Sequence, residues 1–248
     1  MVDGADAEGW SDVAAGWAEL WGSFAAPAQD TLIAECGIGP GTTVLDVGCG
    51  SGEFLARLRE IGAEPVGVDP APHMVAAASA HADVVLADAE HLPFGAGRFD
   101  VVTAVNALQF ADDTRAALTD FARVLAPGGR LGVANWAEGA RNDIDVIERA
   151  VAAAVDEEPI PDGPLRPAGG LEAAMRDAAL EVLSSGIVEV PWRAPDEVTL
   201  VRGILLGEDA ATLAALHSVV VDAASPFRTA EGGYVLRNAF RWAVARPR

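Results

Sequence analysis

A glycine-rich turn that follows a predicted buried strand could hold a small ligand. Residues 43–47 (TVLDV) are followed by three glycines within residues 48–52 and then by Glu53, where a helical pattern begins. Glycine lets the chain bend tightly and lets a ligand approach the backbone closely. Dinucleotides, nucleoside triphosphates and S-adenosylmethionine are all candidate ligands of such a turn, so the rest of the sequence has to choose between them.

The chemistry of the turn favours a ligand with positive charge and without phosphates. In the dinucleotide fingerprint G-x-G-x-x-G the third glycine falls one place after Gly52, and this place holds Glu53. A carboxylate at the amino end of a helix would oppose a pyrophosphate, which the helix dipole should attract. The chain also contains no lysine, so it has neither the lysine of a phosphate-binding P-loop nor one for a Schiff base.

Acidic residues stand at the ends of three predicted strands: Asp46, Asp69 and Asp88. Asp46 lies next to the turn and would favour an ammonium or sulfonium group in a partly desolvated cleft. Asp69 could accept both hydroxyls of a ribose, and Asp88 could accept a hydrogen bond from an adenine amino group. Each acid could instead be a turn or cap residue, but three independent caps are the less economical account. Together the acids favour S-adenosylmethionine.

Alternating strands and helices would position these residues at one edge of a sheet. We expect a leading helix over 10–35, strands at 43–47, 64–69, 83–88, 99–105 and 131–136, and helices at 52–61, 71–81 and 113–125. Short apolar strands separated by helices are typical of an α/β, doubly wound fold whose parallel sheet is covered on both faces. The ligand of such a fold binds at the carboxyl ends of the strands.

The second half of the chain is less regular. We expect helices at 142–156, 170–180, 196–206 and 208–223 and strands at 183–192 and 234–246. We interpret this half as the last two strands of the sheet with helical insertions between them. Within a single overall domain, the prediction is a helical lid at 1–36, a cofactor-binding core at 37–136 and substrate-binding insertions with the remaining strands at 137–248.

The composition limits the partners and the compartment. The 248 residues carry a formal net charge of −20 with scattered arginines, so nucleic acid is not an expected partner. No run of about 18 apolar residues occurs, so no membrane span is expected. The first residues include Asp3, Asp6, Glu8 and Asp12, which argues against a secretory signal. Two cysteines are too few for a disulfide framework or a cysteine-built metal site, so we expect no metal and a reducing cytoplasm.

Four segments resemble successive motifs of class I S-adenosylmethionine-dependent methyltransferases: VLDVGCGSG, GVDPAPHM, ADAEHLPFGAGRFDVVTAVNALQF and RVLAPGGRLGVANW. They cover residues 40–136 and are most similar to the small-molecule, type 11 enzymes related to the ubiquinone and menaquinone biosynthesis methyltransferases. The resemblance implies a Rossmann-like sheet of seven strands with an antiparallel last strand. It also implies S-adenosylmethionine as the methyl donor and S-adenosylhomocysteine as the product.

The resemblance assigns roles to residues of the core. The glycines would cradle the methionine part, Asp69 would bind the ribose, Met74 would pack on the adenine, and Asp88 with Ala89 would meet its edge. Asn106 would line the sulfonium end. The candidate cofactor-binding residues are Asp46, Gly48, Cys49, Gly50, Gly52, Asp69, Pro70, Met74, Asp88, Ala89, Glu90 and Asn106.

The acceptor side is less defined. Its candidate substrate-binding residues are Trp17, Trp21, Gln109 and Trp136, although the tryptophans of the leading helix also fit its buried face. Many relatives carry histidine at the position of Gln109, so this chain departs from them at a place where an imidazole could act. His217 and Asn106 are weak candidates for a catalytic role, because a lone helical histidine is more often structural or exposed.

These residues predict methyl transfer to oxygen, nitrogen or carbon of a small, partly apolar acceptor. The acidic, alanine-rich composition suits a bacterial enzyme of natural-product biosynthesis. A cyclase, lyase or isomerase on the same scaffold could bind the cofactor without transferring its methyl group, because a fold does not fix a reaction. A regulatory protein that has lost catalysis is a third reading, although neither the glycine turn nor the acids at the strand ends are disrupted. The acceptor and the oligomeric state stay open.

Overall fold

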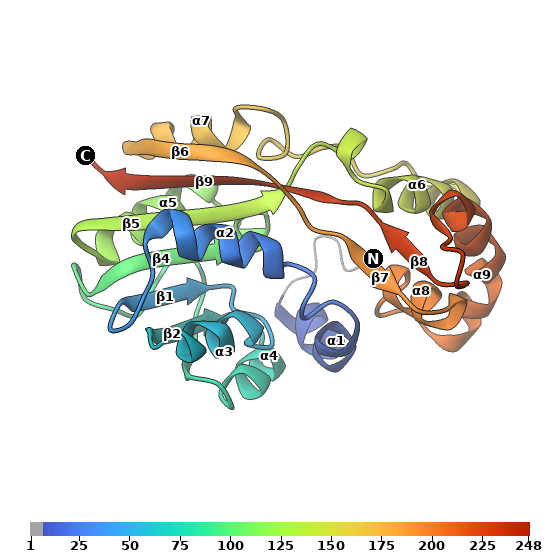
Figure 1. The fold of residues 1–248 in the computed structure, drawn as a ribbon, viewed down its shortest axis with the longest axis horizontal. Coiled ribbons are helices and arrows are strands. Elements are labelled where there is room, and N and C mark those ends of the chain that lie inside the picture. Colours follow the sequence, from blue (N-terminus) through green and yellow to red (C-terminus); the bar gives the residue numbers. More distant parts are fainter. Residues whose placement is uncertain (1–6) are drawn as a thin grey trace.

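A seven-stranded sheet forms the centre of the structure, a computed structural model that describes residues 7–248 (Figure 1). Residues 1–6 of the predicted lid, with Asp3 and Asp6, lie outside the described residues. The strands are β1 (Thr43–Val47), β2 (Glu64–Asp69), β3 (Asp83–Leu86), β4 (Phe99–Val105), β5 (Leu125–Trp136), β6 (Leu180–Glu189) and β9 (Ala239–Pro247). Their order is β3-β2-β1-β4-β5-β9-β6.

The pairing of the strands confirms the predicted fold class. β1 pairs in parallel with β2 and β4, and β4 pairs in parallel with β5. β9, the last strand in the sequence, lies antiparallel between β5 and β6. The sheet is therefore the doubly wound, Rossmann-like sheet with an antiparallel last strand that the motifs predicted.

Helices cover both faces of the sheet, each over its own hydrophobic core. One core contains residues of α2 (Ala26–Cys36) and α3 (Glu53–Glu60), and the other contains residues of α5 (Thr114–Val124) and α7 (Gly170–Asp177). Successive strand residues alternate between the two cores, as Val101 and Val102 of β4 do. α4 (Pro72–Ala78) packs beside β2 and β3. The carboxyl ends of β1, β4 and β5 consequently point to one side of the molecule (Figure 1).

The predicted single helix over 10–35 is wrong, because two helices occupy this stretch. α1 (Ala7–Leu20) and α2 are separated by a turn at residues 21–25. Pro27 lies in the first turn of α2, where proline is tolerated, whereas inside a continuous helix it would remove a backbone hydrogen bond. The break lets α2 cover a face of the sheet while α1 lies beyond the carboxyl ends of the strands (Figure 1).

A helical unit lies on the same side as the carboxyl ends of the central strands (Figure 1). It consists of α6 (Ile144–Ala154), α8 (Glu197–Ile204), α9 (Ala210–Ala224) and a small sheet of β7 (Trp192–Ala194) and β8 (Tyr234–Leu236). The predicted strands at 183–192 and 234–246 are therefore each split in two. Pro191 precedes β7 and has no N–H for a ladder, which is consistent with the chain leaving the main sheet there.

Three short 3₁₀ helices complete the described elements: η1 (Leu108–Phe110), η2 (Gly139–Arg141) and η3 (Ser225–Phe227). By length and composition alone, the described residues hold one helix that could cross a membrane, the window Ala210–Phe227 with mean hydropathy 1.3. This window contains α9, which packs against α6 and α8 and buries Leu216, Val220 and Ala224. The absence of a membrane span stays a prediction.

Candidate functional site

The three glycines of the turn between β1 and α3 serve different purposes. Gly48, Gly50 and Gly52 all have positive φ angles, of 70°, 55° and 95°. A Cβ atom at Gly48 would lie 2.4 Å from the Cβ of Ala107, and one at Gly52 would lie 2.8 Å from the Cα of Ala78. At Gly50 the nearest of the surrounding atoms is the indole Nε1 of Trp17, 3.8 Å away. Gly48 and Gly52 thus permit close packing, whereas Gly50 faces open space beneath Trp17.

Asp69 ties the end of β2 to the glycine turn. Its carboxylate accepts hydrogen bonds from the backbone N–H of Gly50 and of Ala71, each at 2.9 Å. The side chain is buried, with 6% of the residue exposed. Burial raises the pKa of Asp69 above its usual range, and the two backbone hydrogen bonds oppose this shift. The lone pairs that remain on both oxygens could accept ribose hydroxyls, so the predicted ribose-binding role of Asp69 stays a prediction.

Asp46 is a second buried acid on the adjacent strand. It is 3% exposed, and its carboxylate accepts a hydrogen bond of 2.7 Å from the hydroxyl of Thr103 on β4. The pKa of Asp46 is raised to about 7, chiefly by burial; the Thr103 hydrogen bond opposes this shift, and the charge of Asp69 adds to it. A bound cation would therefore stabilise the ionised form. Sequence reasoning missed Thr103, although a polar residue within the apolar strand FDVVTAV was a usable signal.

Cys49 and Glu53 complete the turn. The Cys49 thiol is buried, and burial with the nearby acids Asp46 and Asp69 raises its pKa well above the usual value, so the thiol stays protonated. Glu53 begins α3, and its carboxylate accepts a hydrogen bond of 2.7 Å from the Ser51 hydroxyl. The amino end of α3 thus carries a carboxylate, as the sequence indicated, and is poorly suited to a phosphate.

The residues assigned to the adenine lie after β2 and β3. Met74 on α4 is buried in a small cluster with Ala14 and Ala71, against which Trp10 and Trp17 of α1 pack. Pro70 is half-buried, as are Ala89 and Glu90, whereas Asp88 is exposed. The Glu90 carboxylate accepts a hydrogen bond of 3.1 Å from the backbone N–H of Asp113, the residue that caps α5.

Asn106 and Gln109 lie together just after β4. Asn106 has a φ of 56°, which costs strain in a residue other than glycine, and its N–H donates to the carbonyl of Ala134 at 2.7 Å. The Gln109 amide N–H donates to the Asn106 side-chain oxygen at 2.8 Å. The other amide atom of Gln109, Oε1, is buried without a hydrogen-bond partner in the described protein. Two uncharged amides therefore border this end of the sheet.

The predicted acceptor residues fall into different environments. Trp136, at the end of β5, is half-buried with its ring centroid 5.6 Å from that of Phe24 and 5.0 Å from that of Phe240. Trp17 is also half-buried, whereas Trp21 is buried and stacks on Trp192 with a centroid distance of 4.4 Å. Trp21 therefore connects the turn after α1 to β7 of the helical unit.

His217 lies apart from this group. It is exposed on α9, which packs against α6 and α8. The structure does not bring it together with the glycine turn. Among residues 7–248, no cluster of three or more histidine, cysteine, aspartate or glutamate side chains could hold a metal ion.

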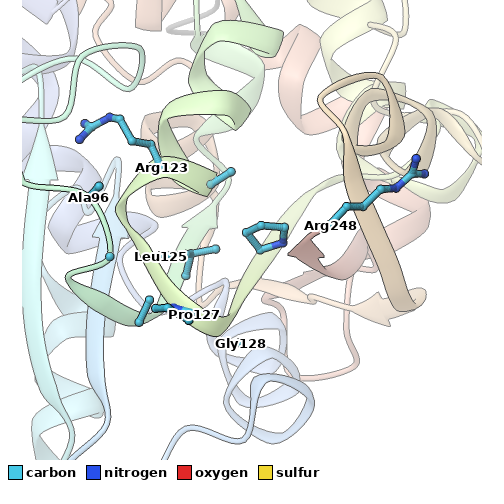
Figure 2. Close-up of a pocket in the computed structure, with 10 residues that line it drawn as sticks. Ala96, Arg123, Leu125, Pro127, Gly128 and Arg248 are labelled. Atoms are coloured by element: carbon cyan, nitrogen blue, oxygen red, sulfur yellow. The ribbon is translucent and has the colours of Figure 1, made fainter.

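A surface hollow of about 420 Å³ is lined by none of these residues. Figure 2 shows its lining side chains. Its lining comes from residues 96–97, from residues 122–123 and 125–128 at the end of α5 and the start of β5, and from residues 247–248 at the end of the chain. The side chains of Arg123 and Arg248 point away from each other (Figure 2). The hollow is thus at the amino end of β5, opposite to the edge that carries the glycine turn.

The residues at the turn fit S-adenosylmethionine. Gly50 leaves space where a side chain would stand. Burial raises the pKa of both Asp46 and Asp69, so a nearby positive charge would stabilise their ionised forms. The ammonium and sulfonium groups of this molecule supply such charge, and its ribose hydroxyls match the free lone pairs of Asp69. A pyrophosphate would meet Asp46, Asp69 and Glu53 instead.

Comparison with known proteins agrees with this chemistry. Residues 45–133 match the family described as "Methyltransferase domain". A demethylmenaquinone methyltransferase of Mycolicibacterium paratuberculosis is 43% identical over 101 residues, which are 40% of this chain and 44% of that protein. An uncharacterized protein of Mycobacterium tuberculosis is 36% identical over 118 residues, which are 45% of this chain and 43% of that protein. The matched part thus spans less than half the length of these curated relatives.

Solved structures show the fold over more of the chain. A Bacillus halodurans protein provisionally described as a methyltransferase covers 89% of this chain and 99% of its own, with a TM-score of 0.62 and 16% identity. The [4+2]-cyclase SpnF covers 89% of this chain and 80% of its own, with a TM-score of 0.57 and 20% identity. Residues 45–133, which match the methyltransferase domain family, are distantly homologous to the demethylmenaquinone methyltransferases, which confirms the resemblance of the motifs.

Proposed function

We propose that this protein is an S-adenosylmethionine-dependent methyltransferase that acts on oxygen, nitrogen or carbon of a small, partly apolar acceptor. The observation that carries the proposal is the pair of buried carboxylates, Asp46 and Asp69, beside the glycine turn of a methyltransferase domain. Acids that are buried without a basic partner favour a cationic ligand. We also propose a reducing, cytoplasmic location, since both cysteines are free and buried.

The chemistry asked of the chain is mainly positioning. When bound, S-adenosylmethionine supplies a methyl group on an already activated leaving group. Asp69 would orient the ribose, Gly50 would admit the methionine part, and α1 would exclude water from above. The aromatic rings of Trp136, Phe24 and Phe240 offer an apolar surface to the acceptor.

Proton transfer is not provided by the groups after β4. Asn106 and Gln109 are amides, which can orient an acceptor hydroxyl or amine but cannot remove its proton. His217 is exposed on α9, so it does not supply a base at this place. We therefore infer that the acceptor is either nucleophilic as it stands or acidic enough to lose its proton to water.

A second candidate function is cyclase, lyase or isomerase chemistry with the cofactor retained. The similarity to the [4+2]-cyclase SpnF supports this second candidate function, because the shared fold accommodates both kinds of reaction. The described residues that fit the cofactor are the same in both cases.

The fate of the methyl group decides between the two functions. The protein would be incubated with methyl-labelled S-adenosylmethionine and a panel of phenols, amines and enols, and products would be analysed by mass spectrometry. Transfer of label to an acceptor, lost in a Gly50→Val variant, is the expected result. A product that forms without label transfer would contradict the methyltransferase proposal and favour the second function. Failure to bind S-adenosylmethionine or S-adenosylhomocysteine at all would refute both.

A further inference from the structure

The indole N–H of Trp17 differs from those of Trp21 and Trp192 in having no acceptor among residues 7–248. The N–H of Trp21 donates to the carbonyl of Gly203 at 3.1 Å, and that of Trp192 donates to the carbonyl of Leu20 at 2.7 Å. Within residues 7–248, no hydrogen-bond acceptor is found for the Trp17 N–H. Because the N–H groups of partly buried tryptophans usually find a partner, this donor is available to a ligand.

The same N–H lies over the glycine turn. Trp17 Nε1 is 3.8 Å from the position of a Cβ atom at Gly50, and no other atom outside the turn comes within 4 Å of that position. The ring is held by its neighbours, with centroid distances of 5.2 Å to Trp10 and 6.0 Å to Phe24. A ligand seated on Gly50 would therefore meet a donor whose orientation is already set.

The turn itself offers few donors to an anionic group. The N–H groups of Gly48 and Cys49 both donate to the carbonyl of Val68, at 2.8 and 3.0 Å. The N–H of Gly50 donates to Asp69. A carboxylate placed here would also be repelled by the buried acids on β1 and β2 unless a donor from another element compensates.

We propose that the Trp17 indole N–H donates a hydrogen bond to the α-carboxylate of bound S-adenosylmethionine or S-adenosylhomocysteine. The proposal rests on the proposed function, because it uses the same cofactor site. The two charged groups of the amino-acid part would then be bound by different parts of the protein. Asp46 and Asp69 favour the ammonium, and Trp17 of α1 supplies the donor for the carboxylate. Trp17 then becomes a cofactor-binding residue rather than part of the acceptor wall.

The test compares three probes by isothermal titration calorimetry. S-Adenosylhomocysteine has the carboxylate, its decarboxylated analogue keeps the ammonium only, and 5′-methylthioadenosine has neither. Trp17→Phe keeps an aromatic ring and removes the N–H. We expect it to weaken S-adenosylhomocysteine binding by about tenfold or more, as for loss of a hydrogen bond to a charged group. Binding of the other two probes should stay within about twofold of wild type, since neither makes the lost hydrogen bond.

Trp21→Phe is the matched control, because it removes an indole N–H that serves Gly203 instead. It should not change the ratio between S-adenosylhomocysteine and its decarboxylated analogue. Trp17→Tyr is a second variant that retains a ring and gains an O–H donor, and it should recover part of the ratio. Unchanged binding of 5′-methylthioadenosine shows in the same samples that each variant is folded.

Two results would overturn the proposal. Equal weakening of all three probes by Trp17→Phe would mean that Trp17 acts only by packing, and wild-type affinity for S-adenosylhomocysteine would mean that no such hydrogen bond forms. If the wild-type protein bound none of the probes, the cofactor site itself would be refuted. That outcome is distinct from a loss of discrimination confined to the carboxylate.

Discussion

Replacement of Asp69 by asparagine tests whether the buried carboxylate only stabilises the glycine turn or also binds the cofactor. Both oxygens of Asp69 accept backbone N–H groups, from Gly50 and Ala71 at 2.9 Å. Asparagine keeps one acceptor oxygen and turns an amide donor toward the other N–H, so one hydrogen bond to a charged group is lost. A loss of about 1.5–3 kcal/mol is typical for such a bond.

The expected loss of stability lies at the lower end of that range. Burial raises the pKa of Asp69, so its ionised form is already penalised in the folded protein, and asparagine escapes this penalty. For a chain of this size each 1 kcal/mol corresponds to about 2–4 °C, so the melting temperature should fall by about 3–8 °C. The Kd for S-adenosylhomocysteine should rise by about tenfold to a hundredfold, because the variant also offers the ribose a weaker acceptor.

The assay pairs thermal unfolding by circular dichroism with calorimetric titration of S-adenosylhomocysteine. Asp100→Asn is the control, since the Asp100 carboxylate accepts from the N–H and the hydroxyl of Thr43 at the amino end of β1, far from the turn. It should change stability only. If Asp69→Asn lowered the melting temperature but kept the wild-type Kd, Asp69 would only stabilise the conformation of the turn and would not belong to the cofactor site.

Two further predictions concern the glycine turn and the adjacent Asp46 of β1. Gly50→Ala should fold, with a strain of about 1–2 kcal/mol from its positive φ, and should weaken S-adenosylhomocysteine binding at least about tenfold by filling the ligand's space. Gly48→Ala should lower the melting temperature more than Gly50→Ala does, because its Cβ would lie 2.4 Å from that of Ala107. If Gly50→Ala bound S-adenosylhomocysteine with wild-type affinity, the ligand would not occupy the space next to Gly50. Because the pKa of Asp46 is about 7 in the folded protein, ionisation of Asp46 costs stability as the pH rises from about 4 through about 7. A bound cation lowers this pKa, so the affinity for S-adenosylmethionine should increase between about pH 6 and pH 8, and Asp46→Asn should flatten the profile in a calorimetric pH series.

The core of the fold was predictable because its signals are local. β1, β2 and β4 begin and end where the apolar runs 43–47, 64–69 and 99–105 do. Glycine and acidic residues end two of these runs, so the residues that mark the strand ends are also those of the candidate site. The alternation of strand and helix then left few alternatives to a doubly wound sheet.

The leading helix shows how a periodic pattern misled. Trp17, Trp21 and Phe24 recur at three- and four-residue steps, which predicted one helix. In the structure these aromatics pack together across a helix end and a turn, with Trp21 and Phe24 at a centroid distance of 5.2 Å. Past residue 20, the regular spacing of the aromatic residues therefore reflects tertiary packing and not a continuing helix. Pro27 was the local signal that the helix must restart.

Other features of the site depend on contacts between distant parts of the chain. Trp21 stacks on Trp192, from the opposite half of the sequence, and no local sequence pattern predicts this contact. Asn106 has a positive φ, which asparagine adopts more often than most residues other than glycine, but nothing in its local sequence requires this conformation. Such features follow from the assembled core and become visible only in the folded structure.

The structure separates the three acids that the sequence places at strand ends. Asp46 and Asp69 are buried, and burial raises the pKa of both carboxyls. Asp88 is exposed after β3, so water competes for its oxygens and an adenine amino group gains less from it. The electrostatic case for a cationic ligand therefore rests on the two acids beside the glycine turn. Asp88 can contribute selectivity for the adenine edge, but it adds little to the attraction of positive charge.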